Sequence, residues 1–175
     1  MSAHVPLETE IKLPISHLEA LRERLVASGF RETVPMQEET SILWDRAGEL
    51  RARGEAIRVR SFAGQTRLTW KGPRLEDARF KVRPEEETGV EDRRALEAIL
   101  GALGLAPCFE MTKQRAVMQR SGLVACLDRT PFGTYLELEG DREIIQQAVS
   151  ELGLEGIPPE TRSYPALFEA WRQGR

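Results

Sequence analysis

Apolar and charged residues alternate along several segments of the chain, which is the two-residue period of a β-strand with unlike faces. The first such segment covers residues 5–13, with Leu7, Ile11 and Leu13 on one face and Glu8, Glu10 and Lys12 on the other. The same pattern predicts strands at 41–45, 56–62, 65–71, about 108–119, 122–129 and 133–139. Ala63-Gly64 and Arg120-Ser121-Gly122 are typical of the tight turns between antiparallel neighbours.

Four segments have helical spacing instead. The first follows Ser16, which forms a predicted capping box with Glu19, and it ends at Gly29. The second begins after Asp92 as N-cap and ends at Gly104, and the other two cover 141–152 and about 164–172. No low-complexity linker divides the chain. About eight strands and four helices predict an α+β fold in which strands prevail, in a single domain over residues 1–175.

The amino-acid composition limits the kinds of molecule that the protein is expected to bind. The chain has 25 basic and 28 acidic residues, and its pI near 5.6 argues against a protein that wraps nucleic acid. The sequence shows neither a signal peptide nor an apolar run of membrane-spanning length, and Cys108 and Cys126 form no CxxC motif. We therefore expect a soluble cytoplasmic protein with reduced thiols in its core. The two histidines lack zinc-ligand spacing, so a metal would be held by oxygen.

Charged residues two positions apart recur on most of the predicted strands, and this spacing places each set on one strand face. The sets are Glu8, Glu10 and Lys12; Arg58 and Arg60; Arg83, Glu85 and Glu87; Lys113 and Arg115; and Glu137 and Glu139. A solvent-exposed face is the usual explanation for one such pair. Five strands with short like-charged clusters favour another explanation, because like charges repel unless an ion of opposite sign intervenes. If these faces line a barrel, its interior suits Mg²⁺ or Mn²⁺ together with a polyphosphate.

Glu8-x-Glu10-x-Lys12 resembles the ExExK signature of the CYTH domain, which is found in the triphosphate tunnel metalloenzymes. That family includes class IV adenylyl cyclases, thiamine triphosphatases and inorganic tripolyphosphatases. The similarity continues in order through residues 50–60, Thr69-Trp70-Lys71-Gly72-Pro73, Arg83-x-Glu85-x-Glu87, Lys113-Gln114-Arg115, Leu127-Asp128 and Phe132-Gly133-x-Tyr135-x-Glu137-x-Glu139. Thr161-Arg162-Ser163-Tyr164 is similar to the C-terminal segment of the cyclase-type members. The resemblance covers almost the whole chain.

The resemblance implies a closed antiparallel barrel of eight strands with helices packed outside, and it implies roles for the charged residues. The expected metal ligands are Glu8, Glu10, Asp128, Glu137 and Glu139, with Glu85 and Glu87 as further candidates. The expected phosphate-binding residues are Lys12, Arg58, Arg60, Lys71, Arg83, Lys113 and Arg115. Glu8, Glu10 and Lys71 are expected to be catalytic.

The expected reaction is metal-dependent hydrolysis of a small triphosphate such as tripolyphosphate, thiamine triphosphate or a nucleoside triphosphate. Two alternatives stay open: cyclisation of ATP to cyclic AMP and pyrophosphate, and binding of polyphosphate or nucleotide without turnover. Leu43 stands where many family members have an aromatic residue, so a tyrosine-assisted step is not available there. The expected partner is the small molecule, with no nucleic acid and no membrane. The oligomeric state is left open, with a homodimer as one option.

Overall fold

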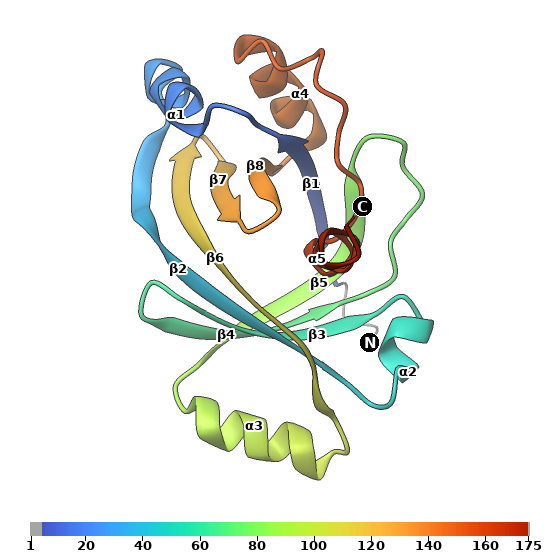
Figure 1. Cartoon of the computed structure of the whole chain (residues 1–175). Helices are drawn as coiled ribbons and strands as arrows, with labels where there is room; N and C mark the ends of the chain where they lie inside the picture. Colours follow the sequence, from blue (N-terminus) through green and yellow to red (C-terminus); the bar gives the residue numbers. More distant parts are fainter. Residues whose placement is uncertain (1–4, 175) are drawn as a thin grey trace. The chain divides into compact units, whose positions relative to one another are not determined.

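The computed structural model describes residues 5–174, and its strands form a closed barrel (Figure 1). The order around the barrel is β1-β5-β4-β3-β2-β6-β7-β8. The strands are β1 (Leu7–Pro14), β2 (Arg31–Asp45), β3 (Ala56–Phe62), β4 (Gln65–Lys71), β5 (Lys81–Val90), β6 (Ala106–Arg120), β7 (Leu123–Thr130) and β8 (Gly133–Glu139). The helices are α1 (Leu18–Ala27), α2 (Glu49–Ala52), α3 (Arg93–Ala102), α4 (Arg142–Glu151) and α5 (Tyr164–Arg172). The predicted α+β class with a closed eight-stranded antiparallel barrel is confirmed.

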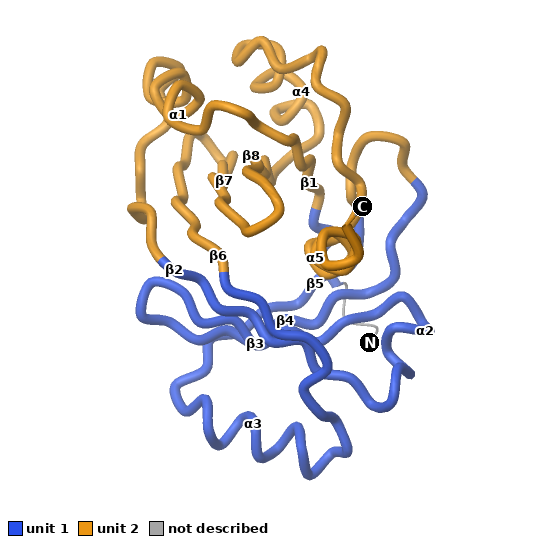
Figure 2. The backbone as a smooth tube through the Cα atoms, viewed as in Figure 1, with its two compact units in different colours: residues 1–8, 38–76, 82–112 blue, residues 9–37, 77–81, 113–175 orange. Residues whose placement is uncertain are grey.

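Two compact units make up the chain, and each is assembled from segments that are distant in sequence (Figure 2). Unit 1 contains the described residues up to Glu8 together with 38–76 and 82–112. Unit 2 contains 9–37, 77–81 and the described residues from 113 onward. The single domain over residues 1–175 stays a prediction.

In unit 1, helix α3 covers the apolar face of the β2-β3-β4 sheet (Figure 1). Cross-strand pairing places Ile42, Val59 and Leu68 in one row. Leu100 of α3 is buried in the same cluster. Asp92 caps the helix by accepting a hydrogen bond from the backbone N–H of Ala95 at 3.0 Å, as predicted. Because side chains alternate along a strand, the charged residues of β3 and β4 lie on the face opposite α3.

In unit 2, the central residues of strands β1, β7 and β8 are buried on both faces. One face carries rows of leucine such as Leu13, Leu136 and Leu127, which are paired across the strands and 0% exposed. The other face carries Lys12 and Glu137, also a cross-strand pair, which are 1% and 5% exposed. A solvent-exposed face therefore does not explain the charges of these strands.

Several local predictions are wrong. Helix α1 begins at Leu18 with His17 as N-cap, so Ser16 lies one position too early to form the predicted capping box. Strand β2 begins at Arg31 rather than at 41, because its polar first half gives no clear alternation. A short fifth helix, α2, was not predicted. Cys126 is buried as expected, whereas Cys108 is exposed. Among the described residues, no helix has the length and apolar character needed to cross a membrane.

Asp77 organises the turn before β5 and thereby positions Lys81, the first residue of that strand. Its carboxylate accepts hydrogen bonds from the backbone N–H groups of Arg79 at 2.9 Å and Phe80 at 2.8 Å. The guanidinium of Arg142 donates a third hydrogen bond at 2.6 Å. The two backbone donors, followed by Arg142, lower the pKa of Asp77 to about 2.

Asp77→Asn is expected to lower the free energy of unfolding at neutral pH, because the uncharged side chain accepts these hydrogen bonds less well. The folded-state pKa of about 2 lies below the ordinary value of 3.8, so this stabilisation is present above the ordinary pKa and is lost as the pH falls toward 2. Urea denaturation of both proteins at about pH 7, 4 and 3 measures the difference, which should shrink with the pH. The exposed neighbour Glu76, as Glu76→Gln, is the control. A difference that stays constant over this range would contradict the assignment.

Candidate functional site

The first group of charged residues, the unit 1 ionic cluster, lies on the face of β2, β3, β4 and β5 opposite α3. Its members are Glu39, Arg58, Arg60, Arg67, Lys71, Glu85 and Glu87, with Glu8 at its edge. Glu87 is its main acceptor: hydrogen bonds reach its carboxylate from Arg60 at 3.2 Å, Arg67 at 2.8 Å and Thr69 at 2.8 Å. The Arg58 guanidinium lies 3.7 Å from Glu87 and 3.9 Å from Glu85.

The strand register explains why these acids and bases are neighbours. Arg60 and Arg67 are directly opposite each other on β3 and β4, an arrangement that is unfavourable for two like charges. Glu87 lies on the next strand, opposite Thr69, and contacts both guanidinium groups. The positive charges of Arg60 and Arg67 are therefore balanced by the carboxylate of Glu87 on a neighbouring strand. This carboxylate is the opposite charge that the sequence pattern led us to expect.

Lys71 connects two carboxylates of this cluster. Its ammonium group lies 3.1 Å from Glu8 and also forms an ion pair with Glu85. Burial and a hydrogen bond to Glu8 raise the pKa of Glu85 to about 8. Burial also opposes the charge of Glu8, but the hydrogen bond from Glu85 and the charges of Lys71 and Arg58 outweigh it and lower the pKa of Glu8. A hydrogen bond thus joins the two coupled carboxyl groups, with the pKa of Glu85 raised and the pKa of Glu8 lowered.

The second group, the unit 2 ionic cluster, is more deeply buried. Its members are Lys12, Lys81, Lys113, Arg115, Asp128, Glu137 and Tyr164. Arg115 holds Asp128 with two parallel hydrogen bonds of 2.7 and 2.6 Å, and it contacts Glu137 at 2.5 Å. Lys113 donates to Asp128 at 2.9 Å. The planar fork of arginine suits this two-point contact with a carboxylate.

Burial of this cluster sets its protonation states. Burial opposes the charge of Glu137, but Arg115, Lys113, Lys81 and Lys12 outweigh it and hold the pKa of Glu137 well below its usual range. Burial together with the neighbouring charge of Lys81 lowers the pKa of Lys12 to about 7. For Lys81, burial is outweighed by the carboxylates of Glu10 and Glu137, which raise its pKa. The cluster thus retains ionised groups of both signs in a buried setting.

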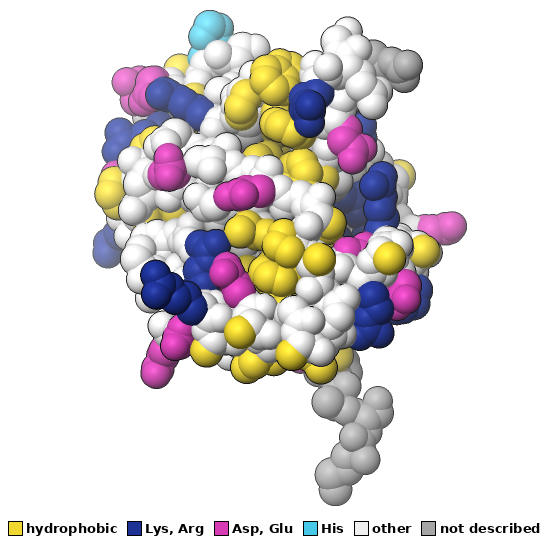
Figure 3. Space-filling model, turned by 60° about the horizontal axis from the view of Figure 1, so that its bottom comes forward, with side chains coloured by type: hydrophobic (Ala, Val, Ile, Leu, Met, Phe, Trp, Pro, Cys, Tyr) yellow, Lys and Arg dark blue, Asp and Glu magenta, His cyan; other side chains and the backbone are white. Residues whose placement is uncertain are grey.

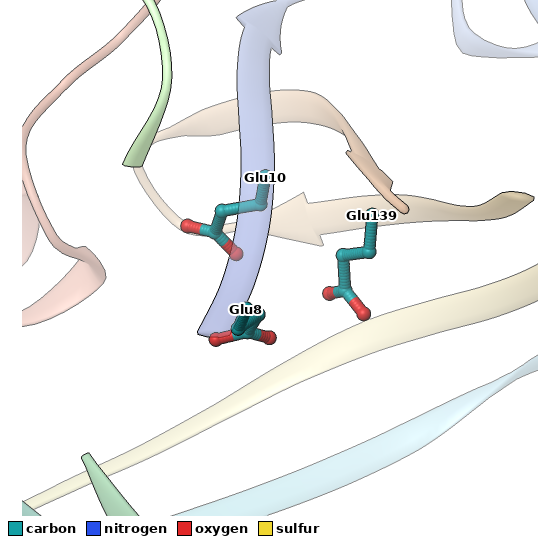
Figure 4. Close-up of side chains that lie close together, drawn as sticks. All are labelled: Glu8, Glu10 and Glu139. Carbon is teal, nitrogen blue, oxygen red and sulfur yellow. The ribbon is translucent and has the colours of Figure 1, made fainter. Parts of the chain in front are cut away.

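Three carboxylates meet where β1 pairs with β8 (Figure 4). Glu8 and Glu10 lie two residues apart on β1, and Glu139 of β8 is directly opposite Glu10 in the strand register. One carboxylate oxygen from each residue lies within 4.8 Å of the other two. Glu10 also accepts a hydrogen bond from Lys81 at 2.7 Å. We call these three residues the acidic trio.

The donor set of the acidic trio fits a hard divalent cation. Such cations are bound by carboxylate oxygens, and a negative cross-strand pair such as Glu10 and Glu139 is unfavourable without a positive charge between the strands. The other predicted metal ligands lie among bases: Glu85 beside Lys71, Glu87 beside Arg60, and both Asp128 and Glu137 beside Arg115.

Arg83 is placed differently from the other predicted phosphate-binding residues. Its guanidinium donates to the backbone carbonyl oxygens of Gly72 at 2.8 Å and of Gly54 at 3.0 Å. These contacts join the end of β4 to the loop after α2. We therefore leave Arg83 out of the proposed phosphate-binding set.

Three charged residues of the site, Lys81, Glu39 and Arg67, are absent from the set predicted from the sequence. Arg67 lies four positions before Lys71 on the same face of β4, so the two-residue period could have found it. Lys81 lies two positions before Arg83 on the same strand face, so the spacing rule could have found it. Glu39 is 2% exposed and lies 3.7 Å from Arg60, but it precedes the predicted start of its strand at residue 41. Acidic and basic side chains are intermixed on the face shown in Figure 3, which agrees with the near-balanced charge.

The fold and the site together define a closed eight-stranded barrel whose strands carry clusters of acidic and basic residues, partly buried in unit 1 and buried in unit 2. The CYTH domain family matches residues 6–164, so the chain belongs to the CYTH family. A protein of Methanocaldococcus jannaschii named “Putative adenylate cyclase” is 29% identical over 134 residues, which are 76% of each chain.

Solved structures share the fold at low sequence identity. A Vibrio parahaemolyticus protein described as a “putative adenylate cyclase” has a TM-score of 0.78 at 18% identity, covering 94% of this chain and 98% of that chain. A “putative adenylyl cyclase” from Hippeastrum, reported with a dominant triphosphatase activity, has a TM-score of 0.65 at 21% identity, covering 96% of each chain.

Asp128→Ala is expected to lower the free energy of unfolding by about 3–5 kcal/mol, because it leaves Lys113 and Arg115 buried with one fewer carboxylate. Equilibrium denaturation in urea measures the loss. The exposed Glu155, as Glu155→Ala, should change the stability by less than about 0.5 kcal/mol. A loss below about 1 kcal/mol for Asp128→Ala would show that the unit 2 ionic cluster does not depend on this carboxylate.

Proposed function

We propose that this protein hydrolyses a small triphosphate in a reaction that depends on Mg²⁺ or Mn²⁺. The observation that carries the proposal is the acidic trio on β1 and β8 of a barrel whose strands also carry two clusters of arginine and lysine. Carboxylates suit the cation and the basic residues suit phosphate oxygens, so the two kinds of group together match a metal triphosphate. Membership of the CYTH family supports the same proposal.

The acidic trio would hold the cation, because Glu8, Glu10 and Glu139 each offer a carboxylate oxygen. Bound there, the cation would supply Lewis-acid polarisation of a phosphoryl oxygen. Lys81 and Lys71 contact Glu10 and Glu8 and so keep both carboxylates oriented. This orientation by neighbouring groups is the usual support for metal ligands.

The basic residues would hold the phosphates and neutralise the charge that builds up during hydrolysis. In unit 1 these are Arg58, Arg60 and Lys71, and in unit 2 they are Lys12, Lys113 and Arg115. Phosphoryl transfer needs little covalent participation from a protein, so positioning and electrostatic stabilisation are what these side chains contribute. Water would attack a phosphorus atom and form a new P–O bond while the bridging P–O bond breaks. The proton of the water would pass to solvent or to the departing phosphate, and the cationic side chains would stabilise the departing phosphate oxygen.

Cyclisation of ATP is the second candidate, and the names of the relatives favour it. The Methanocaldococcus relative and the Vibrio structure are both named for adenylate cyclase activity. The Hippeastrum protein is also named for that activity but is reported with a dominant triphosphatase activity. The same bases and carboxylates would serve both reactions, which differ in the nucleophile and in the phosphorus atom that it attacks.

Product analysis separates the candidates. The purified protein is incubated with Mg²⁺ or Mn²⁺ and with tripolyphosphate, thiamine triphosphate or ATP, and the products are separated by chromatography. Release of orthophosphate is the expected result. Formation of cyclic AMP and pyrophosphate would show that the protein cyclises ATP instead of hydrolysing it. Binding without either product would show that the protein binds the triphosphate without turnover.

Glu10→Gln is expected to reduce metal-dependent turnover on the order of 100-fold, because the amide removes one negative charge from the acidic trio. Mutation of residues that merely support metal ligands already lowers metal affinity or activity by roughly 10- to 100-fold. Isothermal titration with Mn²⁺ should show weaker binding in the same variant. The exposed Glu143 of α4, as Glu143→Gln, is the matched control for both measurements. Full activity in Glu10→Gln would show that the acidic trio does not serve the reaction.

A further inference from the structure

The C-terminal segment is tied to β1 beside Lys12, one of the proposed phosphate-binding residues. The backbone N–H of Glu160 donates to the carbonyl oxygen of Lys12 at 2.8 Å. The Lys12 ammonium in turn donates to the carbonyl oxygen of Arg162 at 2.6 Å. Ser163 then caps α5, with its side chain accepting from the backbone N–H of Ala166 at 3.4 Å. These contacts fix the place at which Tyr164, the first residue of α5, enters unit 2.

The Tyr164 ring lies against two ammonium groups of the unit 2 ionic cluster. The distance from the ring centroid is 4.2 Å to the Lys12 nitrogen and 4.3 Å to the Lys113 nitrogen. Both are within the range of cation–π attraction, which is stronger where the cation is shielded from water, and both lysines are at most 5% exposed. One ring thus lies against two lysine amino groups that repel each other when both are protonated.

The Tyr164 hydroxyl makes a second contact with the cluster. It donates to Asp128 at 2.5 Å, on the same carboxylate oxygen that accepts from Lys113 and Arg115. Burial, followed by the charges of Glu137 and Asp128, raises the pKa of Tyr164 well above its usual value, so the phenol keeps the proton that it donates. The Tyr164 hydroxyl therefore competes with Lys113 and Arg115 for hydrogen bonds to the Asp128 carboxylate. Without the hydroxyl, those hydrogen bonds would be made by Lys113 and Arg115 alone.

The ring also packs in an aromatic group, which is the ordinary role of a buried tyrosine. Its centroid lies 5.6 Å from Tyr135 and 6.1 Å from Phe132, and Phe132 contacts Phe168 of α5 at 6.2 Å. Packing accounts for an aromatic ring at this position. It does not explain why two ammonium groups lie against that ring. It also does not explain the hydrogen bond from the Tyr164 hydroxyl to Asp128, which a phenylalanine could not make.

We propose that Tyr164 is a positioning residue that sets the placement of Lys12 and Lys113 for binding the phosphates. The ring fixes the two ammonium groups relative to each other, and the hydroxyl limits how firmly Asp128 retains the bases. This role rests on the proposed function, because it requires that the two lysines bind phosphate.

The test is the affinity for inorganic tripolyphosphate, measured by isothermal titration in EDTA so that metal-dependent turnover does not follow binding. Tyr164→Leu removes the ring and is expected to raise the dissociation constant roughly 10- to 100-fold through the loss of two cation–π contacts. Tyr164→Phe keeps the ring and is expected to raise it roughly 3- to 10-fold, because Asp128 then holds Lys113 and Arg115 more firmly. Phe168→Leu, a matched change in the same aromatic group, should stay within about twofold.

A double-mutant cycle separates positioning from a general effect on the fold. In a Lys12→Ala/Lys113→Ala background, Tyr164→Leu should raise the dissociation constant by less than about twofold, because the groups that the ring positions are gone. An undiminished effect in that background, or equal losses in Tyr164→Leu and Phe168→Leu, would overturn the positioning role. If the two lysine substitutions leave the wild-type affinity unchanged, the proposed triphosphate site is itself wrong, and the role of Tyr164 falls with it.

Discussion

The pairing of buried charges is the constraint on which the rest of this structure depends. Removing an ion from water costs several kcal/mol unless an opposite charge and hydrogen bonds replace the lost hydration. In unit 2, Lys113, Arg115 and Asp128 are all at most 5% exposed, and the Asp128 carboxylate lies 2.9 Å from Lys113 and 2.6 Å from Arg115. The antiparallel register makes this possible, because it places a base on one strand directly beside an acid on the next.

The same pairing explains how a barrel can present many bases without unfolding from their repulsion. The Lys12 ammonium donates to the backbone carbonyl of Arg162, and the other cations of the two ionic clusters have carboxylate partners within the chain. A bound triphosphate would therefore exchange ion-pair partners with groups already in place. Strands are rigid supports for such groups, and their preorganisation is what electrostatic catalysis requires. The acidic trio differs from these ion pairs, because Glu10 and Glu139 are opposite each other and carry the same sign of charge, which suits a bound cation.

The sequence predicted the strand faces well because the two-residue period depends only on local geometry. The set of Glu8, Glu10 and Lys12 needed no tertiary information to be placed on one face. Spacing alone could not show whether that face meets solvent or the interior, and the burial of Lys12 supplied the answer. It also could not show which acid neutralises which base, because the contacts of Asp128 are set by the register of β6 and β7.

Other errors have similar physical causes. The N-cap of α1 was misplaced because a capping box needs the helix to begin directly after its serine, and here it begins two residues beyond Ser16. The role of Tyr164 was hidden because it depends on a contact across 152 positions of sequence, from Lys12 to α5. Motif similarity marked the segment that contains Tyr164, but only the folded chain shows what its ring and hydroxyl contact.

Anomalous diffraction from crystals grown with Mn²⁺ and a non-hydrolysable triphosphate analogue tests the central claim most directly. The expected result is a manganese peak coordinated by Glu8, Glu10 and Glu139, with phosphate oxygens contacting the arginine and lysine side chains of the ionic clusters. A manganese peak elsewhere, with the acidic trio and the bases still paired only with one another, would contradict it.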